Sequence, residues 1–448
     1  MDLEQRPVAQ KQLVNTSVRN ITWRGVTVTV NDRKTKQSKT IVDNVEGIVN
    51  AGSGKTTLLN VLARRPTKYR SIDGSILVNG NSVTQSAFRQ ISCFVEQQDA
   101  LIGALTVFET LSFTSRLATS LKRDERLLQI NAVLESFGLV HQADTVIGTI
   151  LRKGISDGQK RRLAVARQLV TSPKILFLDE PTSGLDSAAS FEVVQYLRAT
   201  ARRNNLIVIC SVHQPSTSTF NLFDKLLLVA AGKPHYFGSV SNVNEHYRDI
   251  GVDIAQRVNP TDFLLELVNI DFAQDKAAAS RRLHKLQSAW QASAASKENH
   301  DAILGAERAA ECLYIESSNR PSMCNRTATL LHRSFVKSYR DPMAYSIRLG
   351  FSVSFAILIA TVWIRLDHNQ ESIQSLISEL YFATCFISLS AIIYGPAFIE
   401  DYMQFIQDFR NGLYDATEFA LSNFFISIPL VVLATVAPTI ASACMTRP

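Results

Sequence analysis

The sequence predicts an α/β domain built on a parallel sheet, followed by an all-α domain that enters a membrane. Three observations support this fold class. Two continuous apolar runs, "KILFLDEP" and "NLIVICSVHQP", are typical of strands buried on both faces, and they alternate with helical sequence. The stretch "GSGKTT" has the residues that close a phosphate-binding loop (P-loop). Beyond Ala344 the apolar residues concentrate in long stretches without charges.

Composition excludes several other classes of protein. The 448 residues leave room for about three domains of ~150 residues each. The net charge of +7 comes from scattered lysines and arginines without a nucleic-acid-binding motif, so we expect no nucleic-acid partner. The six cysteines form no CxxC pair, which predicts isolated thiols in a reducing compartment. The charged N-terminus has no apolar core and is not expected to be a signal peptide.

The front half of the chain has the pattern of strands followed by helices. "ITWRGVTVTV" alternates β-forming residues, and "TIVDNV", beyond a polar turn, predicts its hairpin partner. "TTLLNVLARR" has helical spacing, whereas "GSILVNG" and "ISCFVEQQD" predict two further strands. Largely helical sequence then runs from residue 107 to residue 137. This alternation is typical of a parallel α/β sheet.

Two segments connect the front half to the rear half. Residues 271–325 are rich in Ala, Ser, Lys, Arg and Glu and show no strand pattern, which predicts a helical linker. The stretch "RTATLLHRSFVKSYRDP" is amphipathic and basic. It predicts a helix that lies along a membrane surface and ends before Pro342.

The rear half predicts three membrane spans, at about residues 346–365, 379–399 and 419–444. The third contains Pro429 and Pro438, which membrane helices tolerate better than soluble helices do. Basic residues precede the first span and acidic residues follow it, so this span is expected to start in the cytosol. The alternative is a set of buried helices in a soluble domain, which seldom needs three such stretches so close together.

The P-loop pattern G-x-x-x-x-G-K-[ST] is only half present. Gly54, Lys55 and Thr56 fit it, but Val49 occupies the position of the leading glycine. A strand of ~5–6 residues should deliver the chain to that glycine, whereas only "GIVNA" is available. We therefore expect a shortened loop that binds nucleotide poorly, because valine does not readily take the positive φ that a loop glycine adopts.

Asp179 and Glu180 follow an apolar run, at the strand end where α/β sheets hold their ligands. In that place Asp179 is expected to support Mg²⁺, and Glu180 is expected to orient and polarise an attacking water. The alternative is a strand that simply ends in two solvated acids. The motifs on either side of this strand decide between these interpretations.

Four motifs surround this strand in order: "FVEQQD", "GISDGQKRRLAVARQLV", "PTSGLDS" and "SVHQPS". With them the chain resembles the ATP-binding cassette (ABC) family, from about Ile21 to its C-terminus. The resemblance implies a cassette that binds and hydrolyses ATP with Mg²⁺. Asp157 stands where the signature motif of the family has a glycine, and we interpret it as a subgroup variant because Ser156 and Gly158 remain in place.

The resemblance also implies a role for each motif. Gln97 senses Mg²⁺ and contacts the membrane domain, the signature grips the γ-phosphate of ATP bound to the opposite cassette, and His213 lies near the γ-phosphate. The D-loop, Ser183–Asp186, links the two sites. The expected catalytic residues are Glu180, His213 and Gln97. The expected ATP-binding residues are Gly52, Ser53, Gly54, Lys55, Thr56, Thr57, Ser156, Gly158, Gln159 and Asp186, and the expected Mg²⁺ ligands are Thr56, Gln97 and Asp179.

Domain order narrows the resemblance to the G subfamily, the white and pleiotropic-drug-resistance type. The cassette comes first, and "NPTDFLLELVN" lies at the junction, as in that subfamily. "FIEDYMQFIQDFRNGLYDATEFALSN" is similar to its cytosolic loop between the second and third spans, which carries the coupling helix. The implied organisation is an N-terminal tail (1–20), a cassette (21–270), a helical linker (271–325) and the first half of a six-helix membrane domain (326–448).

The resemblance implies a half-transporter that exports lipophilic compounds, contacts membrane lipid and needs a second half, identical or related, to complete each ATP site. We expect a multi-pass membrane protein with its cassette in the cytosol. The short P-loop and the count of three spans predict a shortened product. One alternative is therefore a hydrolysis-deficient fragment that pairs with an intact half as an inhibitory subunit. A soluble ABC ATPase is a third hypothesis, which the apolar stretches disfavour.

Overall fold

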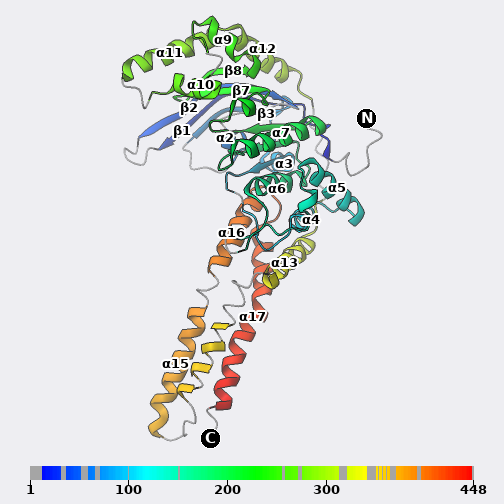
Figure 1. Cartoon of the computed structure of the whole chain (residues 1–448), viewed down its shortest axis with the longest axis vertical. Coiled ribbons are helices and arrows are strands. Elements are labelled where there is room, and N and C mark those ends of the chain that lie inside the picture. Colours follow the sequence, from blue (N-terminus) through cyan, green and yellow to red (C-terminus); the bar gives the residue numbers. More distant parts are fainter. Residues whose placement is uncertain are drawn as a thin grey trace. The chain divides into compact units, whose positions relative to one another are not determined.

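Figure 1 shows the computed structural model of the chain, which describes residues 13–31, 37–51, 59–65, 71–98, 100–149, 152–254, 258–270, 275–311, 320–340, 350–351, 353–355, 357–359, 361–363, 370–390 and 395–445. The chain divides into two compact units. The first consists of Met1–Asp99, Leu121–Ala143 and Ser156–Asn319, and the second of Ala100–Ser120, Asp144–Ile155 and Arg320–Pro448. The second unit therefore combines a segment of the predicted cassette with the predicted membrane domain.

An antiparallel sheet in the first unit contains β1 (Asn20–Asn31), β2 (Ser38–Asn50) and β3 (Ser71–Val78), in the order β2-β1-β3. β1 and β2 form the predicted hairpin. β2 is longer than predicted and continues to Val49, which pairs with Ile21 and is fully buried. Gly47 is required within this strand, because a Cβ atom there would lie 2.4 Å from the ring of Trp23.

The residues that precede the P-loop thus belong to the antiparallel sheet. Because Val49 lies in a strand, it does not need the positive φ of a loop glycine. The P-loop itself, residues 52–58, lies outside the described residues, and its predicted shortening stays a prediction. The six predicted ligands in that segment are Gly52, Ser53, Gly54, Lys55, Thr56 and Thr57.

The predicted parallel sheet is confirmed. β4 (Ser92–Val95), β5 (Ile175–Leu178) and β6 (Ile207–Cys210) pair in the order β4-β5-β6, and both pairs are parallel. Every residue of β5 is buried, as its continuous apolar sequence predicts. Three helices connect these strands to the rest of the unit: α3 (Gln85–Ile91), α6 (Asp157–Leu169) and α7 (Ser187–Asn204).

The remaining elements of the first unit surround these sheets. β7 (Lys225–Ala230) and β8 (Lys233–Ser239) form an antiparallel hairpin. Further helical elements are α2 (Leu59–Leu62), α5 (Arg123–Ser136), η2 (Val140–Gln142), α8 (Thr217–Phe220), η3 (Val240–Asn242), α9 (Val243–Asp249) and α10 (Pro260–Val268). One apolar core joins residues from both sheets, the hairpin, α9 and α10.

The stretch that composition predicts as a linker contains two helices, α11 (Lys276–Ala292) and α12 (Ala294–Arg308). Trp290 of α11 belongs to the core of the first unit and lies 4% exposed. Glu307 of α12 forms an ion pair of 3.0 Å with Arg24 of β1. These helices therefore pack against the strands of the cassette, while the position of the domain boundary stays a prediction.

Four helices of the second unit are joined by small apolar clusters: α4 (Val107–Ala118), α13 (Met323–Arg340), α16 (Gly395–Arg410) and α17 (Ala416–Met445). Leu117 of α4 packs with Leu330 of α13 and with Tyr414, which precedes α17. Phe405 of α16 stacks on Phe419 of α17, with ring centroids 4.5 Å apart. The other elements of this unit are η4 (Gln370–Ser372) and α15 (Ile373–Ser390).

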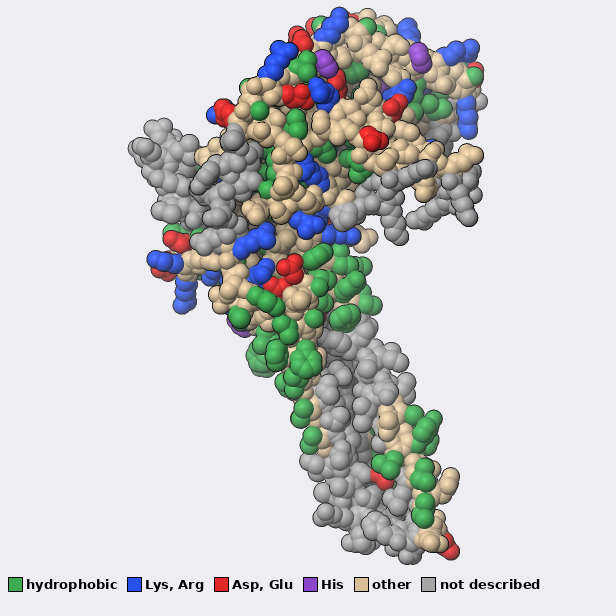
Figure 2. Space-filling model, turned by 180° about the vertical axis from the view of Figure 1, so that it is seen from behind, with side chains coloured by type: hydrophobic (Ala, Val, Ile, Leu, Met, Phe, Trp, Pro, Cys, Tyr) green, Lys and Arg blue, Asp and Glu red, His purple; other side chains and the backbone are tan. Residues whose placement is uncertain are grey.

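Within the described residues, no helix has the length and hydropathy needed to cross a membrane. Two of the predicted spans, 346–365 and 379–399, include residues outside the described ones, and all three spans stay predictions. Most exposed large hydrophobic side chains belong to the second unit, where they form much of the green surface in Figure 2. Examples are Phe335, Tyr339, Leu380 and Phe382.

Candidate functional site

Three of the predicted site residues, Gln97, Asp179 and Glu180, lie at one edge of the parallel sheet. Gln97 comes two residues after β4, Asp179 and Glu180 come directly after β5, and Ser211 comes directly after β6. Because the carboxyl ends of parallel strands meet at the same edge, three segments of chain converge here. Backbone hydrogen bonds continue the sheet by one residue on each side of β5, from Asp179 N to Val95 O (2.9 Å) and from Ser211 N to Leu178 O (3.0 Å).

The amide of Gln97 is bonded to the carboxylate of Glu180. Gln97 Nε2 donates to Glu180 Oε2 at 2.7 Å and to Ser183 Oγ at 3.4 Å. The sequence predicts both residues as catalytic, and the structure brings them into direct contact although 83 positions separate them. The carboxylate is thereby aimed at the turn that carries Gln97.

Ser211 joins the two acids, and the sequence reasoning missed it. Its hydroxyl donates to Asp179 Oδ1 at 2.7 Å and accepts a hydrogen bond from the backbone N–H of Glu180 at 2.8 Å. One hydroxyl therefore orients a carboxylate and fixes a backbone amide. Its place at the end of a buried strand, two positions before His213, is the signal that points to it.

Arg161 of α6 is a second residue that the sequence reasoning missed. Its side chain is buried, with 3% of the residue exposed, and the guanidinium donates to backbone carbonyls of the turns that follow β4 and β5. The accepting residues are Glu96 (2.8 Å), Gln97 (3.2 Å), Asp179 (2.8 Å), Glu180 (3.2 Å) and Pro181 (3.2 Å). A buried arginine needs such acceptors, since unpaired donors are costly inside a protein.

The backbone of Glu180 is left-handed, with a φ of +43°. A non-glycine residue in this region is uncommon and costs of order 1–3 kcal/mol, so its neighbours must hold it there. The N–H of Glu180 is fixed by Ser211, and its carbonyl accepts from Arg161 and from the backbone N–H of Ser183 (3.1 Å). Hydrogen bonds to the N–H and to the carbonyl of Glu180 therefore hold the conformation that directs its carboxylate.

Two predicted residues are not part of this hydrogen-bonded group. His213 is exposed, and no hydrogen bond connects it to another described residue. Asp186 caps the N-terminus of α7, where its carboxylate accepts from Ala189 N at 2.7 Å. Their roles in catalysis and ATP binding stay predictions.

The signature residues lie at the N-terminus of α6. Ser156 and Gln159 form a capping box, in which Ser156 N donates to Gln159 Oε1 (2.9 Å) and Gln159 N donates to Ser156 Oγ (3.3 Å). A Cβ atom on Gly158 would lie 3.3 Å from the side chain of Ala189. Asp157, the unusual residue, is 82% exposed at its side chain and pairs with Lys160 at 3.0 Å. The aspartate therefore leaves the cap of the helix intact.

The oxygen atoms at the sheet edge fit Mg²⁺. In the described part of the chain, the second carboxylate oxygen of Asp179 and Oε1 of Gln97 have no hydrogen-bond partner. Carboxylate, amide and water oxygens are the ligands that Mg²⁺ takes. No group of three or more His, Cys, Asp or Glu side chains that could hold a metal occurs among the described residues. The ion would therefore need ligands beyond the side chains at this edge, as the prediction of Thr56 implies.

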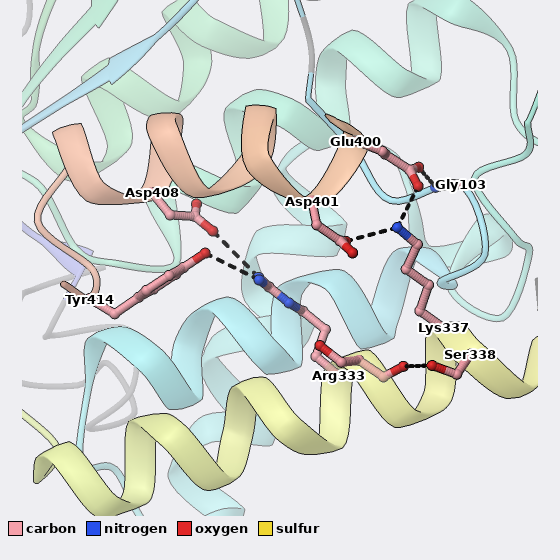
Figure 3. A network of polar contacts seen from close by, with 9 residues as sticks. Gly103, Arg333, Lys337, Ser338, Glu400, Asp401, Asp408 and Tyr414 are labelled. Carbon is pink, nitrogen blue, oxygen red and sulfur yellow. Dashed lines mark hydrogen bonds and ion pairs between the residues drawn. The ribbon is translucent and has the colours of Figure 1, made fainter. Parts of the chain in front are cut away.

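A second polar cluster lies in the second unit, and Figure 3 shows the part of it around Arg333 and Lys337. It pairs four cations of α13 with carboxylates of α4, α16 and α17, and we call it the ion-pair ladder. Its bonds are Arg326 to Glu418 (2.7 Å), Arg333 to Asp408 (3.4 Å), Lys337 to Glu400 (2.7 Å) and Asp401 (2.8 Å), and Arg340 to Glu109 (2.6 Å). The cations are spaced by seven, four and three residues, which places them on one face of a helix.

Burial and neighbouring charges act in opposite directions in the ladder. Burial alone lowers the pKa of Lys337, but the carboxylates of Asp401 and Glu400 outweigh burial and raise that pKa above its ordinary value. The pKa of Arg333 is likewise lowered by burial and raised, in net effect, by Tyr414 and Asp408. Both side chains therefore remain charged at neutral pH although the protein covers them.

The ladder corrects the prediction for the amphipathic basic helix. The helix itself is confirmed as α13, and it ends at Arg340. Its basic face was expected to lie along a membrane surface, but Arg333 and Lys337 are buried among carboxylates of the same unit. The spacing of the basic residues predicted that they share one face of the helix. The carboxylates that cover Arg333 and Lys337 come from α16, a different segment of the sequence.

Both parts of the chain match families of known transporters. Residues 48–183 match the family described as ABC transporter, and residues 325–447 match the ABC-2 type transporter family. A second family with that description matches residues 213–349. The solved structure of cbiO1 from Clostridium perfringens, part of the ABC transporter complex cbiONQ, has a TM-score of 0.42 and 20% identity and covers 52% of this chain and 94% of that chain.

Relatives extend across both parts of the chain. ABC transporter G family member 11 of Arabidopsis thaliana is 32% identical over 96% of this chain and 65% of the relative. ABC transporter G family member 1 of Petunia hybrida is 31% identical over 95% and 69%, respectively. The broad substrate specificity ATP-binding cassette transporter ABCG2 of Mus musculus is 31% identical over 86% and 63%.

A parallel sheet that ends in Gln97, Asp179 and Glu180, within a matched cassette, defines an ABC-type ATPase domain, and an ABC-2 type membrane domain follows it. The chain belongs to the G family of ABC transporters. It spans 53% to 69% of the length of its similar curated relatives. The comparisons do not favour a hydrolysis-deficient fragment over a transporter.

Proposed function

We propose that the chain acts as one half of an ATP-driven exporter of lipophilic compounds. The observation that carries this proposal is the contact between the amide of Gln97 and the carboxylate of Glu180, 2.7 Å apart beside Asp179. It gathers an amide, a general-base candidate and a Mg²⁺-ligand candidate at one sheet edge. This is the set of groups that hydrolysis of a nucleotide requires.

Each residue has a distinct task in the proposed reaction. Asp179 and Gln97 would hold Mg²⁺ through oxygen atoms, and the ion would neutralise charge on the phosphates of ATP. Glu180 accepts a hydrogen bond from the attacking water and polarises it toward the γ-phosphate. Glu180 can activate a water only if Gln97 releases its carboxylate or shares that carboxylate with the water. The bond between Gln97 and Glu180 therefore favours a state in which no water is activated.

A second cassette supplies the rest of the site. In the family that the chain resembles, the signature acts on ATP bound to the opposite cassette. Here the side chains of Ser156 and Gln159 each accept a hydrogen bond from the backbone N–H of the other residue at the start of α6, where a helix N-terminus favours phosphate. We therefore propose a dimer with an identical or a related half.

The second unit supports coupling between hydrolysis and transport. Its segment Ala100–Ser120 lies inside the matched cassette and begins three residues after Gln97, yet it is compact with Arg320–Pro448. Arg340 of α13 makes two hydrogen bonds to Glu109 of α4, at 2.6 and 2.8 Å. A displacement of the segment after Gln97 would therefore act directly on the helix that precedes the predicted spans.

The proposed location is a membrane, with the cassette in the cytosol and lipid around the rear helices. The exposed hydrophobic side chains of the second unit and the match to an ABC-2 type transporter support this. Lipophilic cargo is proposed because intact members of the G subfamily that the chain resembles export such compounds.

Hydrolysis of Mg²⁺-ATP by the full chain in lipid nanodiscs tests the proposal. The isosteric Glu180→Gln variant should lose turnover by roughly 10²–10⁴-fold while it retains nucleotide binding, because the amide keeps the shape of the side chain but cannot activate water. Glu245→Gln, an exposed change on α9, is the matched control. Hydrolysis that is equal in the two variants, or absent from the parent chain, would contradict the proposed function.

A further inference from the structure

Arg161 is a buried side chain near the start of α6. It lies five positions beyond Ser156, within the first turns of α6, and it reaches the turns after both β4 and β5. Nε and both Nη atoms donate to carbonyl oxygens, at 2.8–3.2 Å. The side chain therefore connects the helix that begins with the signature to the two turns that carry the proposed chemistry.

The bonds of Arg161 are bonds to backbone, so they fix the path of both turns. Hydrogen bonds from a charged donor are stronger than those between neutral groups, and a planar guanidinium holds several acceptors in fixed directions. A lysine in its place carries three donors on a single nitrogen atom, so it cannot reproduce the five bonds that three nitrogen atoms of Arg161 make to the two turns. The geometry is thus specific to arginine.

The left-handed backbone conformation of Glu180 depends on these bonds. Its left-handed backbone directs the carboxylate to Gln97, and Arg161 bonds the carbonyls of both residues at 3.2 Å. If the arginine is lost, Ser211 still holds the N–H of Glu180, but its carbonyl is left with the bond from Ser183 alone among the contacts described above. The turn is then free to relax toward an unstrained conformation.

We propose that Arg161 is a positioning residue that ties the signature helix to Glu180 and Gln97. Occupation of the signature by ATP of the partner cassette shifts α6, and Arg161 carries this shift to the turn that activates water. This inference rests on the proposed function, since it deepens the role of the same site. It assigns Arg161 no contact with ATP.

The first test compares Arg161→Lys with Arg162→Lys in the full chain. Arg162 is adjacent on α6, but it bonds Phe137 O at 3.0 Å and lies over the ring of Tyr196, away from the sheet edge. Arg161→Lys should lower kcat by roughly 10- to 100-fold with the affinity for ATP within about threefold of the parent, because misplaced groups slow chemistry more than binding. Arg162→Lys should leave kcat within about threefold. Equal effects of the two changes, or a loss confined to KM, would overturn the proposal.

A double variant separates positioning from general destabilisation. If Arg161 acts through Glu180, then adding Arg161→Lys to Glu180→Gln should not reduce the residual single-turnover rate further. Multiplied effects would mean that Arg161 acts independently of Glu180 and would overturn the proposal. If Arg161→Lys does not fold, Arg161→Gln, which keeps two donors, replaces it in the same comparison.

Amide hydrogen exchange tests the inference without any activity. Arg161→Lys should speed exchange at least about tenfold in residues 179–185 and at Gln97. Arg162→Lys should not, because of the two arginines Arg161 is the one that bonds those turns. Unchanged exchange would overturn the inference. If the parent does not hydrolyse ATP but the exchange result holds, the proposed function fails and the positioning role of Arg161 stands.

Discussion

The proposed hydrolysis site (Gln97, Asp179, Glu180 and Ser211; the hydrolysis site below) and the ion-pair ladder differ in the partners of their carboxylates. Among the described residues, Asp179 and Glu180 receive hydrogen bonds from a neutral hydroxyl and a neutral amide, and neither forms an ion pair. Asp401 and Asp408 are buried and bonded to Lys337 and Arg333. A carboxylate without a cation can accept Mg²⁺ or a water proton, whereas a paired one cannot do so without breaking its pair.

The two kinds of carboxylate should differ in the free energy of unfolding that is lost when a partner is removed. Removing one member of a buried ion pair leaves an uncompensated charge and is strongly destabilising, whereas removing a neutral hydrogen bond costs less. The ladder should therefore determine the stability of the second unit, and the site should determine turnover with smaller effects on stability.

The largest effect is expected for Lys337→Met in the ladder. The change leaves Glu400 and Asp401 without their cation and should cost about 3–5 kcal/mol of stability. Lys285→Met on α11, an exposed lysine, is the matched control. Thermal unfolding of the full chain in nanodiscs gives the comparison. If both variants unfold at the same temperature, the ladder does not determine stability and the contrast with the hydrolysis site fails.

A smaller effect is expected for Ser211→Ala in the hydrolysis site. It leaves the backbone N–H of Glu180 without its acceptor and one oxygen of Asp179 without its donor, at about 1–3 kcal/mol. Turnover should fall more steeply than stability, because the hydroxyl orients both acids. The comparison variant is Ser288→Ala, whose hydroxyl bonds only within α11. A change in stability without a change in hydrolysis would place Ser211 among the purely structural residues.

The ladder should also show a dependence on acid pH through Glu109. Burial raises the pKa of Glu109, but hydrogen bonds from Arg340 and Thr106 outweigh burial, so the net pKa lies below the ordinary value of 4.5. A carboxyl with a depressed pKa in the folded state contributes stability above pH 4.5, and this contribution is lost as pH falls below that value. The loss should not exceed about 1 kcal/mol, because water screens this partly exposed pair. Glu109→Gln should abolish that part of the acid sensitivity in unfolding measured from pH 7 to pH 3, and an unchanged profile would contradict the assignment.

The smallest effect is expected for an exposed ion pair of the first unit. Arg19 and Glu311 lie 2.7 Å apart with side chains 71% and 54% exposed. Arg19→Ala should change stability by at most about 0.5 kcal/mol, since solvated pairs contribute little. A loss comparable with that of Lys337→Met would mean that burial is not what distinguishes the ladder.

The local elements, and the position of the two acids that follow β5, could be predicted from the sequence. Alternating β-forming residues encode the hairpin, and the continuous apolar run of β5 encodes a strand buried on both faces, with Asp179 and Glu180 at its carboxyl end. These patterns depend on neighbours within a few positions, where geometry is fixed by the strand or helix itself. Family motifs added Gln97 to the same site, and its contact with Glu180 agrees with that expectation.

The partners of Arg161 and of the basic face of α13 depend on how distant segments of the chain pack together. Arg161 looks like a surface cation in sequence, because arginine is seldom buried unless acceptors converge on it, and its acceptors come from turns up to 65 positions away. The basic face of α13 has no acidic partner in its own segment. Its acids lie 63 to 92 positions further along the chain, or far before it in the case of Glu109. Contacts at such separations depend on how the elements pack, and no periodicity within one segment records them.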